Sequence, residues 1–139
     1  LPGCFGRLPV WAWHKPKPDL RRSGHLEKGA PGVRLELLVP ADRALLSDFD
    51  AWHCVLNRWY LALTGEEYAR WESRLPEGHR PGDELPPELE REMRASWKRI
   101  FDLELLAKSE WVTGGQRVQA ALERIELADV VGVREFVAR

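Results

Sequence analysis

Apolar and polar residues alternate in several stretches of the chain, and this alternation predicts short β-strands. The first strand is expected over 9–14, and the second over 33–39, where Pro40 stops it. A further strand is expected over 130–137, because β-branched residues dominate that stretch. The segment 15–32 contains three prolines and three glycines, which predict a loop between the first two strands.

A helical period of apolar residues follows, and it is the strongest helix signal in the sequence. Ser47 is expected to be the N-cap of this helix, with Asp50 as its capping-box partner three residues later. Gly65 is expected to end the helix, because glycine favours helix C-termini. The apolar positions of the helix are Phe49, Trp52, Leu56, Trp59, Tyr60 and Leu63.

Two further helices are predicted after Gly65. A short one is expected over 66–75, and a long one is expected to start near Pro87. The segment 76–87 between them has four prolines and two glycines, so it is predicted to be a flexible loop. The long helix carries Leu89, Met93, Trp97, Ile100 and Phe101 on one face.

The segment 117–125 fits two periods. Val118, Ala120 and Leu122 alternate as in a strand, whereas Val118, Ala121, Leu122 and Ile125 also fit a helix. With either reading the elements predict an α+β fold. We expect a single domain over 1–139, in which two to three helices pack on a small mixed or antiparallel sheet of three to four strands.

Composition agrees with one globular domain. The chain has 139 residues, enough to bury a core, and 44% of them are hydrophobic. Seven tryptophans are many for this length and predict aromatic-lined grooves beside the core. Net charge is −1 but unevenly spread: residues 1–34 carry seven basic and two acidic side chains, a local charge of +5. The remainder therefore carries −6, and this asymmetry favours an anionic ligand for the N-terminal part.

Cysteine content and hydropathy bear on the compartment. The only cysteines, Cys4 and Cys54, are too few for a disulfide framework, which favours the reducing cytoplasm. No apolar run approaches the roughly 18 residues of a membrane span, and no stretch has the pattern of a signal peptide. The sequence starts with Leu1 rather than methionine, so we expect the domain to be incomplete at its N-terminus.

The basic N-terminal stretch RLPVWAWHKPKPDLRR is the first candidate for a ligand site. Lysine and arginine side chains attract phosphate, and a tryptophan ring stacks on a nucleobase. The alternative is that the tryptophans belong to the core and that the charged residues simply form a solvent-exposed loop. The residues predicted to bind a cofactor are Trp11, Trp13, His14, Lys17, Arg21 and Arg22, and NAD is the cofactor considered.

The helix after Ser47 supplies the second candidate. Asp50, His53 and Asn57 are spaced three and four residues apart, so their side chains are neighbours on one flank of a helix. A carboxylate beside an imidazole holds its tautomer and raises its basicity, as a general base requires. The alternative is that Asp50 only caps the helix and His53 borders the core.

Metal binding is not predicted, because the histidines and cysteines lack the spacing of known metal-binding motifs. Gln119 and Glu123 form a third candidate site, which depends on the secondary structure of 117–125. In a strand both side chains would face a cleft on the side opposite Val118. In a helix they would be ordinary surface residues.

Five blocks of the sequence resemble, in the same order, the bacterial family DUF3841, a domain of unknown function. They are PVWAW, KPDLR, VPADRALLSDFDAWHCVLNRWYL, SWKRIFDL and VQAALERIELADVVGVREF, and together they cover nearly the whole chain. Members of that family usually carry a further N-terminal segment. The resemblance implies kinship but no activity.

The C-terminal block is also similar, more weakly, to the end of ADP-ribosyltransferase-type domains. The resemblance implies that Gln119 or Glu123 would face the nicotinamide ribose of NAD, as a Glu or Gln on such a strand does in those domains. The segments that grip NAD in those domains have no counterpart in this chain. Fold-level analogy does not by itself establish function.

Three hypotheses follow from these candidates. The first is a cytoplasmic, enzyme-like domain with a nucleotide- or NAD-binding cleft, at most a transferase resembling ADP-ribosyltransferases. The second is a non-catalytic module that binds nucleic acid or a protein partner through the basic N-terminal segment. The third is a purely structural role, in which one core contains Trp11, Trp13, Trp52, Trp59 and Trp97.

Overall fold

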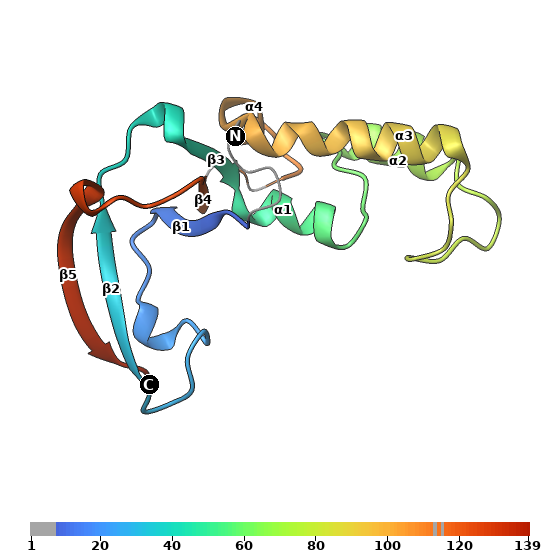
Figure 1. The fold of residues 1–139 in the computed structure, drawn as a ribbon. Helices are drawn as coiled ribbons and strands as arrows, with labels where there is room; N and C mark the ends of the chain where they lie inside the picture. Colours follow the sequence, from blue (N-terminus) through green and yellow to red (C-terminus); the bar gives the residue numbers. More distant parts are fainter. Residues whose placement is uncertain (1–7, 113, 115) are drawn as a thin grey trace. The chain divides into compact units, whose positions relative to one another are not determined.

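The computed structural model describes residues 8–112, 114 and 116–139 (Figure 1). Five strands and four α-helices lie within these ranges, so the predicted α+β class is confirmed. The strands form two sheets. One has three strands in the order β1 (Val10–Lys15), β4 (Val118–Leu122) and β3 (Ala44–Asp48). The other pairs β2 (Pro31–Leu37) with β5 (Val130–Val137).

Three of these strands lie where the sequence predicts them: β1 and β2 from alternation, and β5 from its β-branched residues. The two-period segment 117–125 forms a strand, β4, and all five residues of β4 are buried. β3 was not predicted, because Leu45 and Leu46 are adjacent and interrupt a period of two. A strand buried on both faces needs no polar side to alternate with, which explains why β4 also fits a helical period.

The chain divides into two compact units. The first consists of the described residues up to 46 together with 120–139, and it contains β2 and β5. The second consists of the described residues from 47 to 119. It contains α1 (Phe49–Leu56), α2 (Gly65–Glu72), α3 (Pro87–Ser96) and α4 (Leu103–Ala107).

The start of α1 differs from the sequence-based prediction by one residue. Asp48, not Ser47, is the N-cap, and its carboxylate accepts a hydrogen bond of 2.7 Å from the backbone N–H of Ala51. Ser47 is buried, and its hydroxyl accepts a hydrogen bond of 3.2 Å from the side-chain amide of Gln119. The expected capping box of Ser47 with Asp50 is therefore wrong, since Ser47 still belongs to β3.

Asp48→Ala is expected to lower the free energy of unfolding by about 1–2 kcal/mol, because it removes a buried N-cap acceptor. Asp48→Asn is the matched control, since its amide oxygen can still accept the Ala51 hydrogen bond. Urea unfolding followed by circular dichroism measures both variants. Equal losses for the two would contradict a capping role.

The end of α1 also differs from the prediction, because the helix stops at Leu56 rather than at Gly65. Arg58 has a positive φ of 55°. The N–H of Trp59 donates to the carbonyl of Cys54 at 2.8 Å, and the N–H of Arg58 donates to that of Val55 at 3.3 Å. This pair of bonds is a Schellman C-cap, which usually has glycine where Arg58 lies.

Gly65 therefore begins α2 instead of ending α1, and Thr64 is the N-cap of α2. The short second helix predicted over 66–75 is confirmed by α2. Residues 76–86 form neither helix nor strand, and α3 starts at Pro87 as predicted. A 3₁₀ turn over Trp97–Phe101 continues α3 toward α4.

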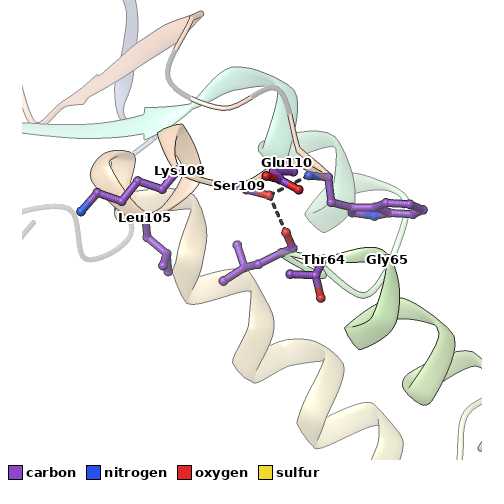
Figure 2. Close-up of a pocket in the computed structure, with 8 residues that line it drawn as sticks. Thr64, Gly65, Leu105, Lys108, Ser109 and Glu110 are labelled. Carbon is purple, nitrogen blue, oxygen red and sulfur yellow. Dashed lines mark hydrogen bonds between the residues drawn. The ribbon is translucent and has the colours of Figure 1, made fainter.

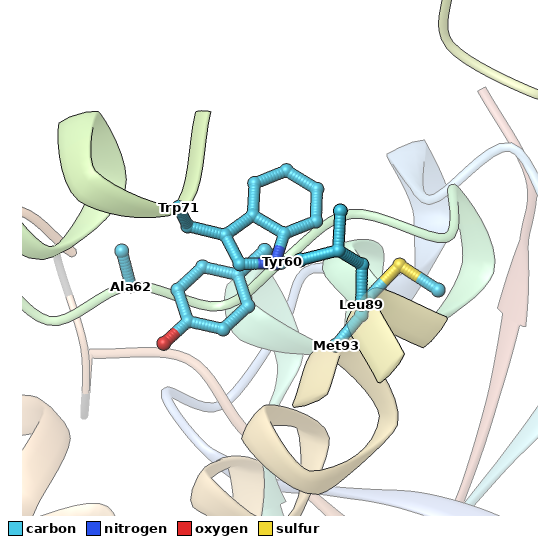
Figure 3. Close-up of a cluster of buried hydrophobic side chains, with 5 residues drawn as sticks. All are labelled: Tyr60, Ala62, Trp71, Leu89 and Met93. Atoms are coloured by element: carbon cyan, nitrogen blue, oxygen red, sulfur yellow. The ribbon is translucent and has the colours of Figure 1, made fainter. Parts of the chain in front are cut away.

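Two clusters of buried side chains hold the helical unit together. In the first, the rings of Tyr60 and Trp71 lie face to face with their centroids 5.0 Å apart (Figure 3). Ala62, Leu89 and Met93 complete this cluster. The second cluster consists of Ala51, Leu61, Ile100 and Leu106. Trp11 and Trp59 are 50% and 51% exposed, so the idea that they fill a core is wrong.

Candidate functional site

Residues 59–64 lie between α1 and α2 in the second unit, which contains all four α-helices. Side chains satisfy the backbone groups of residues 59–64 in place of a neighbouring strand. The Leu61 N–H donates to the hydroxyl of Ser96 at 2.9 Å, and the Leu61 carbonyl accepts from Arg99 at 2.6 Å. The Leu63 carbonyl accepts from the hydroxyl of Ser109 at 2.6 Å. These bonds hold residues 59–64 in one conformation, because buried backbone groups are costly to leave unpaired.

Glu67 is the charged centre of this framework. Its carboxylate accepts from the hydroxyl of Tyr60 at 2.8 Å, the N–H of Leu63 at 2.7 Å and the guanidinium of Arg99 at 2.7 Å. Burial acts to raise the pKa of Glu67, but these hydrogen bonds outweigh burial and hold the pKa below its ordinary value. Burial and the Glu67 hydrogen bond both raise the pKa of Tyr60. Glu67 is therefore an ionised structural anchor rather than a proton donor at neutral pH.

A cavity of about 450 Å³ lies beside the start of α2 (Figure 2). The ring of Trp111 forms one wall and is 54% exposed. A Cβ atom at Gly65 would lie 3.2 Å from this ring, so glycine allows the close approach of Trp111 to α2. Trp111 also stacks on Tyr68, with ring centroids 5.8 Å apart. The other lining residues are Leu63, Thr64, Leu105, Lys108, Ser109 and Glu110.

A second cavity, of about 500 Å³, lies along the other side chains of α2. Its lining residues are Tyr60, Glu67, Arg70, Trp71, Ser73, Arg74 and Glu92. Arg74 forms ion pairs there with Glu92 at 2.7 Å and Glu88 at 3.8 Å. Because Arg74 is already neutralised, this cavity is a weaker anion site than its two arginines indicate.

The strand pair β2–β5 in the first unit has an unusual distribution of burial. The strands are antiparallel, with Val33 opposite Glu135 and Leu35 opposite Val133. Val33, Leu35 and Val133 are 59%, 46% and 61% exposed. We call this surface the open face; it consists of Pro31, Val33, Leu35, Val131, Val133, Glu135 and Val137, all exposed.

The opposite face of β2–β5 carries three charged side chains, Arg34, Glu36 and Arg134, and is partly covered by the loop before β2. A Cβ atom at Gly32 would overlap the Phe136 ring and would lie 2.8 Å from Leu26 of that loop. Glu36 accepts a hydrogen bond of 2.9 Å from Lys17. Antiparallel sheets usually bury their apolar face and expose their polar face, so this pair is inverted.

The sequence anticipated the strands of the open face but not its exposure. The alternation of Val33, Leu35 and Leu37 correctly predicts β2. Alternation shows that two faces differ, yet it does not show which face the rest of the chain covers. The valines at 131, 133 and 137 were the signal that could have indicated a second apolar surface.

The predicted group of Asp50, His53 and Asn57 lies on α1 and at its C-cap, but no hydrogen bond found among the described residues joins one of these side chains to another. The carboxylate of Asp50 pairs with Arg117. Nδ1 of His53 lies 3.0 Å from the carbonyl of Phe49, and the amide of Asn57 donates to the His53 carbonyl at 2.8 Å. Asp50 thus pairs with Arg117 and not with His53.

Arg117 also lies 4.9 Å from the ring centroid of Phe49, and that ring meets the imidazole of His53 edge to face at 5.0 Å. The hydrogen bond to Asp50 raises the pKa of Arg117. Sequence spacing could not reveal this partner, because Arg117 is distant from α1 along the chain and adjacent only in the fold.

Gln119 and Glu123, the third candidate, differ in environment. Gln119 lies within β4 and is 8% exposed, with its amide bonded to Ser47. Glu123 follows the last residue of β4 and pairs with its neighbour Arg124 at 3.6 Å. The prediction that the two side chains line one strand face requires β4 to extend through 123, and β4 ends at Leu122.

The predicted cofactor-binding residues lie on β1 and in the loop after it. Trp11 is half exposed, Trp13 is partly buried, and His14 is exposed. Arg21 is neutralised by Asp19 at 2.8 Å, as Lys17 is by Glu36. Arg22 is exposed on the 3₁₀ turn Leu20–Arg22. Two of the three cations predicted to bind phosphate therefore have carboxylate partners already.

Within the described ranges, no three His, Cys, Asp or Glu side chains are grouped as a metal site would require. Cys4 lies outside the described residues, and burial raises the pKa of the Cys54 thiol. None of the helices in the described part of the chain has the length and hydropathy that crossing a membrane requires.

Comparison with known proteins identifies a family. A family model described as "Domain of unknown function (DUF3841)" matches residues 5–131. No curated protein and no solved structure matches the chain.

Proposed function

Since this chain belongs to the DUF3841 family, which is described as a domain of unknown function, we propose its function from geometry alone: it is a protein-recognition module. The observation that carries this proposal is the open face of β2–β5. Five aliphatic side chains are exposed there, Val33, Leu35, Val131, Val133 and Val137. Contiguous exposed apolar surface marks interaction sites in soluble proteins, whereas single exposed apolar residues are ordinary.

The covered charged face strengthens the proposal. A two-stranded sheet is marginally stable in water unless something packs on it. Here the loop before β2 packs on the side of Gly32 and Phe136, so that side is already partly covered. The apolar side is the one left for a partner to cover.

Burial of apolar area supplies the affinity of this site. The open face has a single charged side chain, Glu135, while Lys17, Arg34 and Glu36 belong to the other face or its loop. A partner held by the basic N-terminal segment, the second hypothesis from the sequence, would instead bind through Lys17 and Arg21, which are already paired. Apolar burial contributes roughly 25 cal/mol per Å², and salt does not screen it as it screens a contact between exposed charges.

Stability measurements test whether the face is open. Replacing Val33 and Val133 by serine together is expected to change the free energy of unfolding by less than about 1 kcal/mol, because both are exposed. The matched control is Val118→Ser, a fully buried valine of β4, which should cost several-fold more. A loss above about 2 kcal/mol for the double variant would show that the face belongs to the core.

Site-specific photo-cross-linking tests whether a partner covers the face. A photoreactive amino acid at Val133 is expected to form one discrete adduct in cells that produce the protein, and the same group at Arg91 of α3 is not. The adduct should disappear when Leu35 and Val131 are both replaced by serine. An adduct that persists in that variant, or that appears equally from Arg91, would overturn the proposal.

A second candidate function is the binding of a nucleotide-type ligand, NAD included, at the cavity beside α2. The observation that favours it is the half-exposed ring of Trp111 next to Gly65. A base or nicotinamide would stack on the ring, and its phosphates would meet Lys108 and the N-terminus of α2. An ADP-ribosyltransferase-like reaction with NAD, and a place in the bacterial cytoplasm, are the finer forms of this second candidate.

Thermal unfolding tests the second candidate. Millimolar ADP or NAD at 0.15 M salt is expected to raise the midpoint, because a ligand of the folded state stabilises it by mass action. Trp111→Ala should abolish the rise, and Trp59→Ala, an equally exposed tryptophan outside the cavity, should keep it. A rise that survives in Trp111→Ala would exclude this cavity as the binding site.

A further inference from the structure

The dimensions of the open face select the kind of element that would cover it. β2 has seven residues and β5 has eight. At about 3.4 Å per residue the pair is roughly 25 Å long, and two strands about 4.8 Å apart present a surface roughly 10 Å wide. An α-helix is about 10 Å across and rises about 1.5 Å per residue. One helix of about 16 residues would therefore cover the face along its whole length.

Glu135 adds a chemical requirement. It lies on β5 between Val133 and Val137 and faces Val33 across the strand pair. Among the described residues Glu135 has no ion-pair partner. Its neighbour in sequence, Arg134, lies opposite Arg34 in the strand register, so its side chain projects to the other face of the sheet. Covering the face would bury a lone carboxylate, which is costly unless the partner supplies a cation.

This requirement argues against a two-fold dimer formed through the open face. A two-fold interface repeats the same surface on both sides, so it would bring two Glu135 carboxylates into one apolar layer with no cation of the open face between them.

We infer that the partner of the open face is a single amphipathic helix whose apolar stripe carries one lysine or arginine opposite Glu135. This inference rests on the proposed protein-recognition function. The aliphatic residues Val33, Leu35 and Val133 supply the burial, and the Glu135 pair sets register and orientation. Partly buried charge pairs contribute to specificity even where their net affinity is small.

Peptide binding to the full chain tests the inference. The probes are three 16-residue helical peptides with blocked ends and an identical leucine and valine stripe, which differ only in a central Lys, Gln or Glu. Fluorescence anisotropy measures their affinities. The Lys peptide is expected to bind at least tenfold more tightly than the Glu peptide, because a buried like-charge contact is strongly unfavourable. Glu135→Lys should reverse that order, and Glu135→Gln should remove most of the difference.

Further variants separate this inference from the proposed function. If all three peptides bind equally and Leu35→Ser with Val133→Ser abolishes binding, the open face is a docking site and the charge requirement is wrong. If no helical peptide binds while the Val133 cross-link forms, the helical occupant is wrong. If binding is unaffected by the serine substitutions, both the inference and the proposed function are wrong. Thermal melts of the Glu135 variants should match the parent, since the side chain is exposed.

Discussion

Replacement of Trp71 by alanine is expected to lower the free energy of unfolding by about 3–5 kcal/mol. Trp71 is 7% exposed, and its ring stacks on Tyr60 in the cluster with Leu89 and Met93. The loss combines the transfer of a large ring to water with the cavity left behind. Urea unfolding monitored by circular dichroism measures it.

Trp71→Phe is the matched control. The indole N–H of Trp71 is buried and has no hydrogen-bond acceptor among the described residues, so phenylalanine removes no hydrogen bond. We expect this variant to cost less than half of the alanine variant, since an aromatic ring still stacks on Tyr60. Equal losses in the two variants would contradict the expectation that stacking on Tyr60, and not the indole N–H, is what Trp71 contributes.

Glu67→Gln is expected to cost about 2–3 kcal/mol at pH 7, because it removes the charge that Arg99 and Tyr60 bind. Glu67 and Arg99 are 21% and 26% exposed, so solvent screens their pair only in part. The variant leaves Arg99 partly buried without its anion. Chemical unfolding of the variant and the parent at pH 7 gives the difference directly.

The same pair predicts a pH dependence. The pKa of Glu67 is lowered in the folded state, because the hydrogen bonds outweigh the opposing effect of burial. The stability that Glu67 contributes is therefore complete above its ordinary pKa of 4.5 and is lost as the pH falls through the folded value. The gap between parent and Glu67→Gln should narrow below about pH 4. A gap that stays constant from pH 7 to pH 3 would contradict this assignment.

The sequence predicted the helices better than their ends. The period of Leu89 and Met93 and the position of Pro87 correctly placed α3. The predicted continuation of α1 through Tyr60 failed, because Arg58 adopts the left-handed conformation that glycine usually supplies. Its side chain donates to Glu90 at 2.9 and 3.0 Å, and this contact with α3 exists only in the folded chain. The local sequence pattern around Arg58 therefore could not predict this contact.

The candidate chemistry followed the same division. Helical spacing predicted that the side chains of Asp50 and His53 are neighbours. In the structure the carboxylate of Asp50 forms an ion pair with Arg117 instead. The basic loop was predicted to hold phosphate, while Glu36, distant in sequence, neutralises Lys17. Spacing along one element predicts which of its own side chains are neighbours, but it does not predict which side chains of other elements contact them in the fold.

The sequence by itself determined the α+β class, the strands β1, β2 and β5 and the helix from Pro87, because periods of 2 and 3.6 residues follow from local backbone geometry. Only the tertiary structure decided that Glu67 anchors the segment 59–64, that Gly65 admits Trp111, and that the apolar side of β2–β5 is exposed. Those features depend on which residues distant in sequence meet in space, and burial is a property of the assembled chain rather than of any local pattern.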